Sequence, residues 1–210
     1  RLCMNKVRAK QVVEAEGVRV AKDIFFTDPN ELDLKLIHQE LGPDLILKPT
    51  DQGSSVALYV LKGIDDLQNS LSSLPSGNWM LEQRVFGREF TVGVLRDMAL
   101  GIVEVIPQGG VYDYKRKYTP GSTDYKYPAI LPLSIEEEVK RQAIDCFRAC
   151  GCRDFARIDF IVSEDGHPHF LEVNTLPGLT STSLLPKSAS CSGYDFSALV
   201  RELLRPAISR

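Results

Sequence analysis

Two short segments near the C-terminal end carry polar residues at spacings that could support chemistry. Arg157 and Asp159 lie two apart in ARIDFIV. Glu172 and Asn174 have the same spacing in HFLEVN. On a β-strand, residues two apart point to the same face. Between the segments, Asp165-Gly166 is flanked by apolar alternation, which is a strong signal for a tight hairpin. We therefore expect an antiparallel strand pair with all four polar side chains on one face.

The register of this hairpin follows from its turn. If the Asp-Gly pair is central, Asp159 lies opposite Glu172. Arg157 then lies opposite Asn174. Opposed Cβ atoms are ~4.5–5.5 Å apart, so the two carboxylates repel unless a positive charge lies between them. In one interpretation Arg157 supplies that charge and the group is a structural salt-bridge cluster. In the other interpretation the group binds a divalent cation, because carboxylate and amide oxygens suit Mg²⁺.

A second signal lies upstream, where Lys48 interrupts the apolar stretch LILKP and precedes TDQGSSV. A buried or half-buried lysine needs a partner. The Gly and Ser residues of the following loop offer backbone N–H groups and hydroxyls to phosphate oxygens. The lysine precedes the glycine, so this is not a Walker A loop. Together with a distal Mg²⁺ face, the lysine and the loop indicate ATP bound between two lobes.

A third signal is the stretch of residues 108–128, which has no apolar periodicity and is typical of a long loop. Its YDYKRKY segment places three tyrosines and three cations within seven residues. Long structureless loops in compact domains are usually functional lids or disordered. This loop is either a solvated connection or a basic, aromatic lid suited to a negatively charged phosphorylated intermediate.

The helices that must position these residues follow from periodicity and capping signals. A first helix is capped by Asn5, runs to about Glu16 and is ended by Gly17. Further helices are expected over residues 30–41, 64–74 and 135–150, and two short ones near the C-terminus.

Strands are expected in the two segments described first and over residues 45–49, 56–61, 79–83, 89–95 and 99–106. The last two form a hairpin about Arg96-Asp97. Helices and strands mix without strict βαβ alternation, so we predict an α+β fold with antiparallel sheets. A boundary near residue 82 divides the chain into lobes of residues 1–82 and 83–210.

The composition limits the classes of function. With 210 residues, 43% hydrophobic residues and a formal net charge of −3, the sequence is ordinary for a globular protein. The near-neutral charge argues against general nucleic-acid binding, and no apolar run approaches the ~20 residues of a membrane span. The N-terminus lacks both an initial Met and a signal-peptide core, so we expect a cytoplasmic piece of a longer chain.

The five cysteines include the spacing C-x3-C-x-C at Cys146, Cys150 and Cys152. Such a cluster could bind zinc, but no matching His/Cys pair follows it in the sequence. We therefore expect the reduced thiols of a cytosolic protein instead of a zinc site.

The order of several motifs resembles that of the D-alanine–D-alanine ligases, which belong to the ATP-grasp superfamily. The motifs are NK near the start, KP-x-x-x-GSSV, E-x-x-x-x-G-R-E-F-T-V, Y-D-Y-x-x-K-Y, A-R-I-D-F, L-E-V-N-T-L-P-G-L-T and T-S-L-L-P. The resemblance implies an ATP-grasp fold that binds the nucleotide between two lobes, with ATP and Mg²⁺, or Mn²⁺ in its place, as cofactors. It also implies ATP-dependent joining of two D-alanines through an acyl phosphate, which serves peptidoglycan synthesis, cell-wall biogenesis and cell shape.

The resemblance assigns nucleotide roles only at matching positions. Lys6 and Lys48 correspond to the lysines that contact the nucleotide phosphates, and Lys117 corresponds to the lysine of the lid. The two serines close the glycine loop, residues 82–85 meet the adenine and Glu89 bonds to the ribose. The full set implied to bind ATP consists of Lys6, Lys48, Ser54, Ser55, Glu82, Gln83, Val85, Glu89 and Lys117.

Metal, catalytic and substrate roles carry over in the same way. The implied Mg²⁺ ligands are Asp159, Glu172 and Asn174, in agreement with the hairpin argument. The residues implied to act in catalysis are Arg157, Ser54, Tyr118 and Gly178. Arg157 contacts the transferred phosphoryl group, Tyr118 closes the substrate side, and Gly178 offers its backbone N–H to the developing oxyanion. Ser183 and Leu184 bind the carboxylate of the second D-alanine.

The implied partners are D-alanine, ATP, a second copy of the chain and an N-terminal domain that binds the first D-alanine and is missing from this sequence. Residues that differ from those common in the family are Asp51-Gln52, Ala57 and Lys115-Arg116. Three other functions remain open: an ATP-grasp carboxylate–amine ligase with a different acceptor, a non-catalytic ATP-binding domain of a fusion protein, and a metal-dependent phosphatase.

Overall fold

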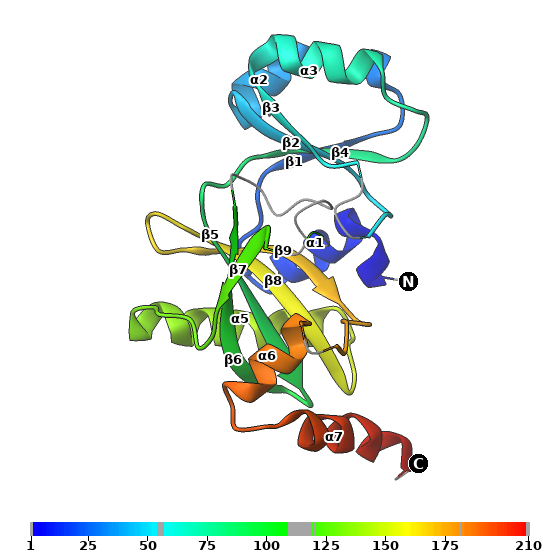
Figure 1. Cartoon of the computed structure of the whole chain (residues 1–210). Coiled ribbons are helices and arrows are strands. Elements are labelled where there is room, and N and C mark those ends of the chain that lie inside the picture. The colour runs from blue at the N-terminus through cyan, green and yellow to red at the C-terminus, as the bar shows by residue number, and fades with distance from the viewer. Residues whose placement is uncertain (1, 54–56, 109–118, 120, 181, 209–210) are drawn as a thin grey trace.

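Two antiparallel β-sheets form the framework of the computed structural model, which describes residues 2–53, 57–108, 119, 121–180 and 182–208 (Figure 1). The smaller sheet has the strand order β1-β4-β2-β3, and the larger sheet has the order β7-β6-β5-β8-β9. All neighbouring strands within the two sheets run antiparallel. The predicted α+β fold, with two antiparallel sheets flanked by helices, is confirmed.

The smaller lobe has two helices on the outer face of its sheet, at the top of Figure 1. Its elements are β1 (Asp23–Phe26), η2 (Pro29–Glu31), α2 (Leu34–Leu41), β2 (Asp44–Pro49), β3 (Tyr59–Lys62), α3 (Gly63–Ser72) and β4 (Trp79–Gln83). Ile37 and Leu41 of α2 pack with Leu67 and Leu71 of α3 against the sheet. Each fully buried side chain of this type stabilises the fold by about 1.5–3 kcal/mol relative to an exposed one.

The larger lobe has helices on both faces of its sheet. Its strands are β5 (Gly87–Leu95), β6 (Met98–Pro107), β7 (Thr123–Lys126), β8 (Phe155–Ser163) and β9 (Pro168–Asn174). Its helices are α5 (Leu133–Ala149), α6 (Leu184–Ser190) and α7 (Phe196–Ile208). The main core lies between α5 and the sheet and includes Phe90, Val139, Phe147 and Phe160. A smaller core with Leu95, Leu100, Leu185 and Leu199 joins the other face to α6 and α7.

Two glycines let α6 approach the sheet closely. A Cβ atom at Gly93 would lie 2.7 Å from Leu185 Cδ1, and one at Gly101 would lie 2.1 Å from Cys191 Cβ. Ser188 fixes the contact, because its hydroxyl accepts a hydrogen bond from Gly93 N at 2.8 Å and donates one to Gly101 O at 2.5 Å. Gly93 lies opposite Arg157 in the β5–β8 pair, so α6 covers the same face that carries the polar residues of β8.

The first helix, α1 (Lys6–Ala15), packs on the larger lobe, although the sequence predicted it within a lobe of residues 1–82. Ala9 and Val13 are buried in the core that also contains Val139 and Phe170. The chain then passes through a parallel bridge between Val20 and Phe170 before it enters the smaller sheet. A boundary drawn along the sequence fails here because apolar residues on α1 find their partners more than a hundred positions away.

Local capping signals predicted several element ends correctly. The Asn5 side chain accepts a hydrogen bond from Arg8 N at 3.0 Å at the start of α1, and Gly17 follows its end with φ +80°. Arg96 and Asp97 have φ 46° and 63° in the tight turn between β5 and β6. Two left-handed residues match the twist of the flanking strands, which is why such turns form hairpins.

Two predicted elements differ from the structure in part. The helix expected over residues 30–41 begins at Leu34, because the Asp33 side chain caps the backbone N–H groups of Lys35 and Leu36. The expected long loop of residues 108–128 contains β7, which pairs with the end of β6. This edge strand is polar and half-exposed, so its sequence shows no alternation of apolar and polar residues. Residues 109–118 and 120 of that stretch lie outside the described residues.

Candidate active site

The β8–β9 hairpin brings the four predicted polar residues together. Asp159 pairs with Glu172, and Arg157 pairs with Asn174, as the sequence predicted. The turn itself differs, because Ser163 N bonds to His167 O and leaves three central residues, with Gly166 at φ +85°. The register then shifts by one at a bulge after Asp159, and this shift restores the predicted pairing.

Asp159 is held from three sides. Arg157 donates two hydrogen bonds to its carboxylate, from Nε at 2.9 Å and from Nη2 at 2.8 Å. Asn174 Nδ2 donates to Asp159 Oδ2 at 3.0 Å and to Glu172 Oε1 at 3.3 Å. Thr91 Oγ1 donates to Asp159 Oδ1 at 2.5 Å from the neighbouring strand β5. Arg157 therefore supplies the charge that the salt-bridge interpretation required, and Thr91 is a contact that sequence reasoning missed.

The same group keeps features that suit a cation. Asp159 is 6% exposed, whereas Glu172 is half-buried and lines an open cleft. Among these four residues, one guanidinium faces two carboxylates, so one negative charge is left over. Within the described part of the chain, no group of three or more His, Cys, Asp and Glu side chains is arranged to hold a metal ion. The candidate set of Asp159, Glu172 and Asn174 contains two side chains of these types, and its third member is an amide.

On the opposite wall, Lys48 belongs to a buried network of charges. Its Nζ lies 2.5 Å from Glu82 Oε1. Glu82 Oε2 accepts from Lys10 Nζ at 3.1 Å, and Lys10 Nζ also lies 2.5 Å from Asp23 Oδ1. Burial by itself raises the pKa of Glu82, but the ammonium groups of Lys48 and Lys10 outweigh it, so this pKa lies below its ordinary value. The network joins α1 to strands β1, β2 and β4.

Lys10 was missed in the sequence, although it carries a usable signal. It lies four residues after Lys6, so the two lysines share one face of α1. Lys10 is 3% exposed, and its Nζ also donates to Ala21 O at 2.8 Å. A lysine this deeply buried is rare without compensating acceptors. Here oxygen atoms of Asp23, Glu82 and Ala21 lie within reach of its three N–H donors.

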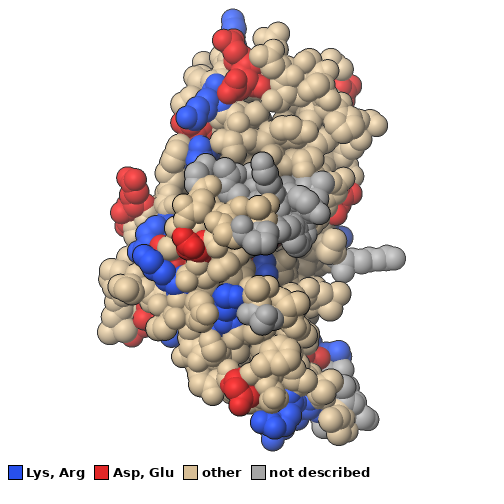
Figure 2. Space-filling view, viewed as in Figure 1, with Lys and Arg blue, Asp and Glu red and all other residues tan. Residues whose placement is uncertain are grey.

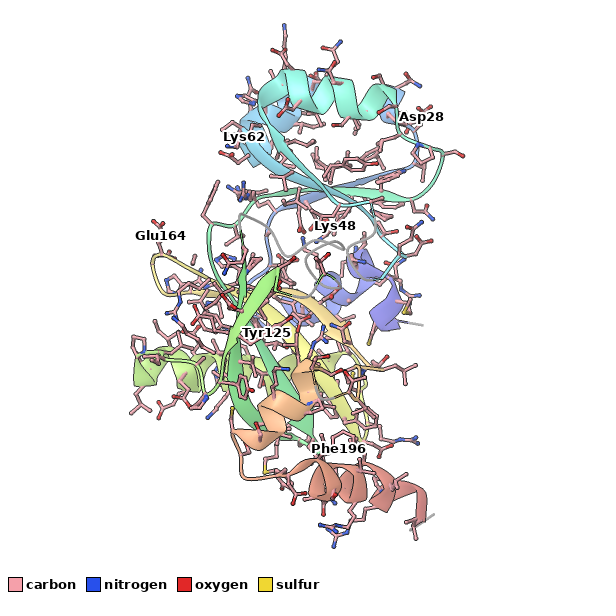
Figure 3. The ribbon with its side chains drawn as sticks, in the orientation of Figure 1. Asp28, Lys48, Lys62, Tyr125, Glu164 and Phe196 are labelled. Atoms are coloured by element: carbon pink, nitrogen blue, oxygen red, sulfur yellow. The ribbon has the colours of Figure 1, made fainter. Side chains whose placement is uncertain are left out.

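A cleft of about 340 Å³ separates the two walls. Figure 3 shows Lys48 between the two lobes. Eight of the residues predicted to form the site line the cleft, namely Lys6, Lys48, Glu82, Gln83, Val85, Glu89, Asp159 and Glu172. Apolar side chains, including Ile46, Leu58 and Ile161, line it as well. An apolar slot with a few convergent polar groups is typical of a small-molecule site.

Lys6 connects α1 to the glycine-containing loop after β2. Its backbone N–H donates to Thr50 O at 2.8 Å, and its Nζ donates to Gln52 O at 2.5 Å. The predicted loop residues Ser54 and Ser55 lie outside the described residues, as do the lid residues Lys117 and Tyr118. Arg88 and Glu104, which sequence reasoning missed, also line the cleft and form two hydrogen bonds of 2.8 Å each.

The remaining predicted residues form a second group near α6. Ser183 Oγ accepts from Thr180 N at 3.0 Å, and a Cβ at Gly178 would lie 2.6 Å from this oxygen. Gly178 and Ser183 are therefore neighbours. The Leu184 side chain is buried with Val103 and Val105, so only its backbone can face a substrate. Arg157, Asn174, Gly178, Ser183 and Leu184 do not line the 340 Å³ cleft.

The surface around the site has mixed charge. On the face drawn in Figure 2, Lys and Arg residues lie in small groups close to Asp and Glu residues. Near α6, the Lys187 ammonium lies 5.1 Å from the centre of the Tyr125 ring and donates to Thr182 O at 2.6 Å. Partial burial lowers the pKa of Lys187. No helix in the described part of the chain is both long and apolar enough to span a bilayer.

Two lobes, each built on an antiparallel sheet, with a small-molecule cleft between them define the ATP-grasp class of fold. The family model described as "D-ala D-ala ligase C-terminus" matches residues 12–205. The chain therefore belongs to the D-alanine–D-alanine ligase family, which confirms the resemblance found in its motifs.

Relatives match nearly the whole chain. It is 37% identical over 208 residues to a D-alanine–D-alanine ligase of Geotalea uraniireducens, covering 98% of this chain and 66% of the relative. It is 35% identical to D-alanine–D-alanine ligase B of Clostridium perfringens, covering 100% of this chain and 69% of the relative. The chain thus spans about two thirds of the length of these relatives.

Solved structures agree with these matches. The D-alanine–D-alanine ligase of Bacillus anthracis superposes with a TM-score of 0.85 at 31% identity, over 99% of this chain and 68% of that one. The same enzyme complexed with ATP gives a TM-score of 0.83 at 30% identity, over 99% of this chain and 67% of that one. The VanG D-Ala:D-Ser ligase of Enterococcus faecalis gives a TM-score of 0.86 at 29% identity, over 97% of this chain and 61% of that one.

Proposed function

We propose that this chain carries the ATP-binding and catalytic part of a ligase that joins two D-alanines into D-alanyl-D-alanine for peptidoglycan synthesis in the cytoplasm. The single observation that carries the proposal is the cleft between the lobes. One wall offers Lys48 and the other offers Asp159 and Glu172. A lysine ammonium group on one wall and carboxylates on the other suit a polyphosphate bound together with a divalent cation.

The first step forms an acyl phosphate. A carboxylate oxygen of the first D-alanine attacks the γ-phosphorus of ATP, the bond to the β-phosphate oxygen breaks, and ADP leaves. Catalysis of such a transfer consists mainly of positioning and of charge neutralisation. Lys6 and Lys48 bind phosphate oxygens, and Arg157 contacts the transferred group. Gln83 and Val85 meet the adenine, and Glu89 bonds to the ribose.

The second step forms the peptide bond. The amine of the second D-alanine attacks the acyl carbon, loses a proton, and phosphate leaves. The tetrahedral oxyanion needs fixed donors, which the Gly178 N–H and Arg157 can provide. The Ser183 hydroxyl and the backbone at Leu184 bind the carboxylate of the second D-alanine. Ser54, Ser55, Lys117 and Tyr118 complete the proposal as the closing loop and lid.

The proposed metal site passes a test of its chemistry. Asp159, Glu172 and Asn174 would hold Mg²⁺, or Mn²⁺ in its place, and the ion would supply charge neutralisation at the phosphate oxygens. Its charge would add to that of Arg157 beside the two carboxylates of Asp159 and Glu172. The Asn174 amide would have to turn, because its Nδ2 now donates to both carboxylates. Thr91 keeps Asp159 oriented from behind, as hydrogen bonds to metal ligands commonly do.

The proposal also includes an N-terminal domain and a homodimer. The chain spans about two thirds of the length of its relatives, and the match to the family model of a ligase C-terminus supports the additional domain. The proposed boundary between the two nucleotide-binding lobes lies near residue 82. The helix α1 precedes this boundary in the sequence but packs on the larger lobe. D-Alanine and ATP are the proposed small-molecule partners.

Two measurements test the proposal. The first is calorimetric titration of ATP into this chain with Mg²⁺ and then with chelator, where we expect binding that depends on Mg²⁺. The second is phosphate release by this chain joined to the N-terminal third of the Geotalea relative. We expect release that requires D-alanine. Release without any amino acid would instead identify a phosphatase, and ATP binding without release would identify a non-catalytic domain.

The acceptor is tested in the same fusion with D-alanine, D-serine and D-lactate as second substrates. We expect D-alanine to be preferred. The structural similarity to VanG D-Ala:D-Ser ligase makes D-serine the acceptor to compare first. A preference for D-serine would keep the ligase class and replace the proposed product.

A further inference from the structure

Three thiols meet on the side of the larger lobe where the N-terminal segment packs. Cys3 lies in the short helix η1 (Leu2–Met4), and Cys150 and Cys152 follow the end of α5. The Sγ atoms of Cys3 and Cys152 are 4.0 Å apart, although the residues are separated by 149 positions. All five cysteines are free thiols, and Cys191 lies apart from this group at the end of α6.

The three thiols differ in accessibility. Cys3 and Cys152 are half-buried, whereas Cys150 is 7% exposed. A small oxidant from solvent therefore reaches Cys3 and Cys152 most easily. In the described part of the chain, no group of three or more His, Cys, Asp or Glu side chains is arranged to hold a metal ion.

We propose that Cys3 and Cys152 form a reversible disulfide when the protein is exposed to hydrogen peroxide. A disulfide has an S–S length of ~2.05 Å, so the two sulfur atoms must approach by about 2 Å from their present separation. Rotation about the Cα–Cβ bonds moves a sulfur atom by this order of distance. Cys152 follows Gly151, which has φ +61°, and lies beyond the end of α5, with its backbone N–H bonded to Phe147 O at 2.9 Å. The Cys152 side chain can therefore rotate while the backbone stays in place.

The chemistry balances with peroxide as the only oxidant. The Cys3 thiolate attacks one peroxide oxygen, the O–O bond breaks, and hydroxide leaves with a sulfenic acid on Cys3. The Cys152 sulfur then attacks the sulfenic sulfur, the S–O bond breaks, and the departing oxygen takes up a proton to leave as water. Two thiols are oxidised to one disulfide, and one peroxide is reduced to two waters.

The electrostatics support this order of events. Hydrogen bonds from the Cys150 and Cys152 thiols lower the pKa of Cys3. The same contact with Cys3, together with burial, raises the pKa of Cys152. The thiolate is the nucleophile toward peroxide. Cys3 is thus the sulfur that reacts first, and Cys152 is the thiol that resolves the sulfenic acid.

The cross-link has a structural consequence beyond the proposed ligase reaction. Cys3 lies three residues before Lys6, whose Nζ reaches Gln52 O beside the nucleotide cleft. A disulfide to Cys152 fixes the beginning of this segment to the larger lobe. It also closes a loop of about 150 residues, which restricts the unfolded chain and raises thermal stability.

Peptide mass spectrometry of the whole chain tests the proposal. The native protein is treated with stoichiometric peroxide, remaining thiols are alkylated, and the digest is searched for cross-linked peptides. We expect two of five thiols to be lost, a mass lower by two hydrogen atoms, and a peptide that joins Cys3 to Cys152. Dithiothreitol restores all five thiols, and the oxidised chain unfolds at a higher temperature by several degrees.

Matched variants separate the pairing from general thiol oxidation. Cys3→Ser and Cys152→Ser abolish the cross-link, whereas Cys150→Ser and Cys191→Ser retain it. Five titratable thiols after treatment would overturn the proposal. So would a cross-link that joins Cys150 to either neighbour, or sulfinic acid on Cys3 without any disulfide. These outcomes are read without ATP or D-alanine, so they are independent of the proposed ligase activity.

Discussion

The two walls of the cleft both carry buried charges, but the described clusters differ in how many cations and carboxylates they contain. In the smaller lobe and α1, Lys10 and Lys48 face Glu82 and Asp23, so positive and negative charges are equal in number. Among the four polar residues of the hairpin, Arg157 is the one cation and lies beside two carboxylates, Asp159 and Glu172. In the first network the four charges pair with one another, whereas the hairpin set has one more carboxylate than cations and lies at an open cleft. Burial of charge alone does not identify a binding site, but an excess of carboxylates within a polar cluster beside a cleft suits a bound cation.

Removal of the Glu172 carboxylate is expected to have the largest effect. Glu172→Ala should lower Mg²⁺-dependent turnover of the fusion with the N-terminal third by more than about 100-fold, because a metal ligand is lost. The thermal midpoint should stay close to that of the wild type, since Glu172 is half-buried. Steady-state phosphate release measures the effect, and Glu164→Ala in the exposed hairpin turn is the control. Wild-type turnover in Glu172→Ala would remove this residue from the metal site.

Disruption of the balanced network should affect stability instead. Lys10→Met leaves Glu82 and Asp23 with less positive charge at a buried position, and we expect a loss of about 3–5 kcal/mol in the free energy of unfolding. Denaturant unfolding followed by circular dichroism measures the change. Lys35→Met, on the exposed side of α2, is the matched control and should change stability by less than about 0.5 kcal/mol. Equal effects of the two variants would show that the network is not structural.

A smaller effect is expected behind the metal site. Thr91→Val removes the hydroxyl that donates to Asp159 and keeps the shape of the side chain. We expect Mg²⁺ to bind about 10-fold more weakly in the presence of ATP, because orienting contacts typically change metal affinity by this factor. Calorimetry at several Mg²⁺ concentrations measures the affinity, and Thr27→Val at an exposed position is the control. Unchanged affinity would mean that Arg157 and Asn174 orient Asp159 without Thr91.

The smallest expected effect is the pH dependence of stability that comes from Glu82 in the network with Lys48 and Lys10. The folded-state pKa of Glu82 lies below its ordinary value because of Lys48 and Lys10, even though burial opposes this. Its stabilising contribution is therefore complete above the unfolded-state pKa of about 4.3 and is lost as the pH falls through the lower folded-state pKa. We expect the thermal midpoint to fall over this acidic range. The fall should be shallower in Glu82→Gln than in the exposed control Glu31→Gln, and equal slopes would contradict the network's role.

The hairpin shows how far local reasoning can reach. The opposition of Asp159 and Glu172 was predicted from a two-residue turn. The structure has a three-residue turn and an offsetting bulge at Leu171 of β9. The pairing was right because side-chain alternation requires the polar residues to share one face, whatever turn delivers it. The bulge could not be read from the sequence, since it depends on how β9 fits against β8.

Other parts of the site needed long-range information. Thr91 contacts Asp159 only because β5 pairs with β8 in one register. Lys10 is buried only because α1 packs on the larger lobe while its side chain reaches the smaller one. Thr91 has no unusual neighbour in the sequence, and the spacing between Lys6 and Lys10 does not by itself show that Lys10 is buried. Their roles come from contacts between segments about 68 to 72 positions apart.

The local features and the family could be predicted from the amino-acid sequence. The caps at Asn5 and Gly17, the turn at Arg96-Asp97, the alternation in the late strands and the order of the motifs all depend on residues close together along the chain. The lobe that holds α1, the lysine that is buried and the thiols that meet became known from the three-dimensional fold. Those outcomes depend on packing between distant segments, where the burial of many apolar side chains, and not any local preference, selects the neighbours.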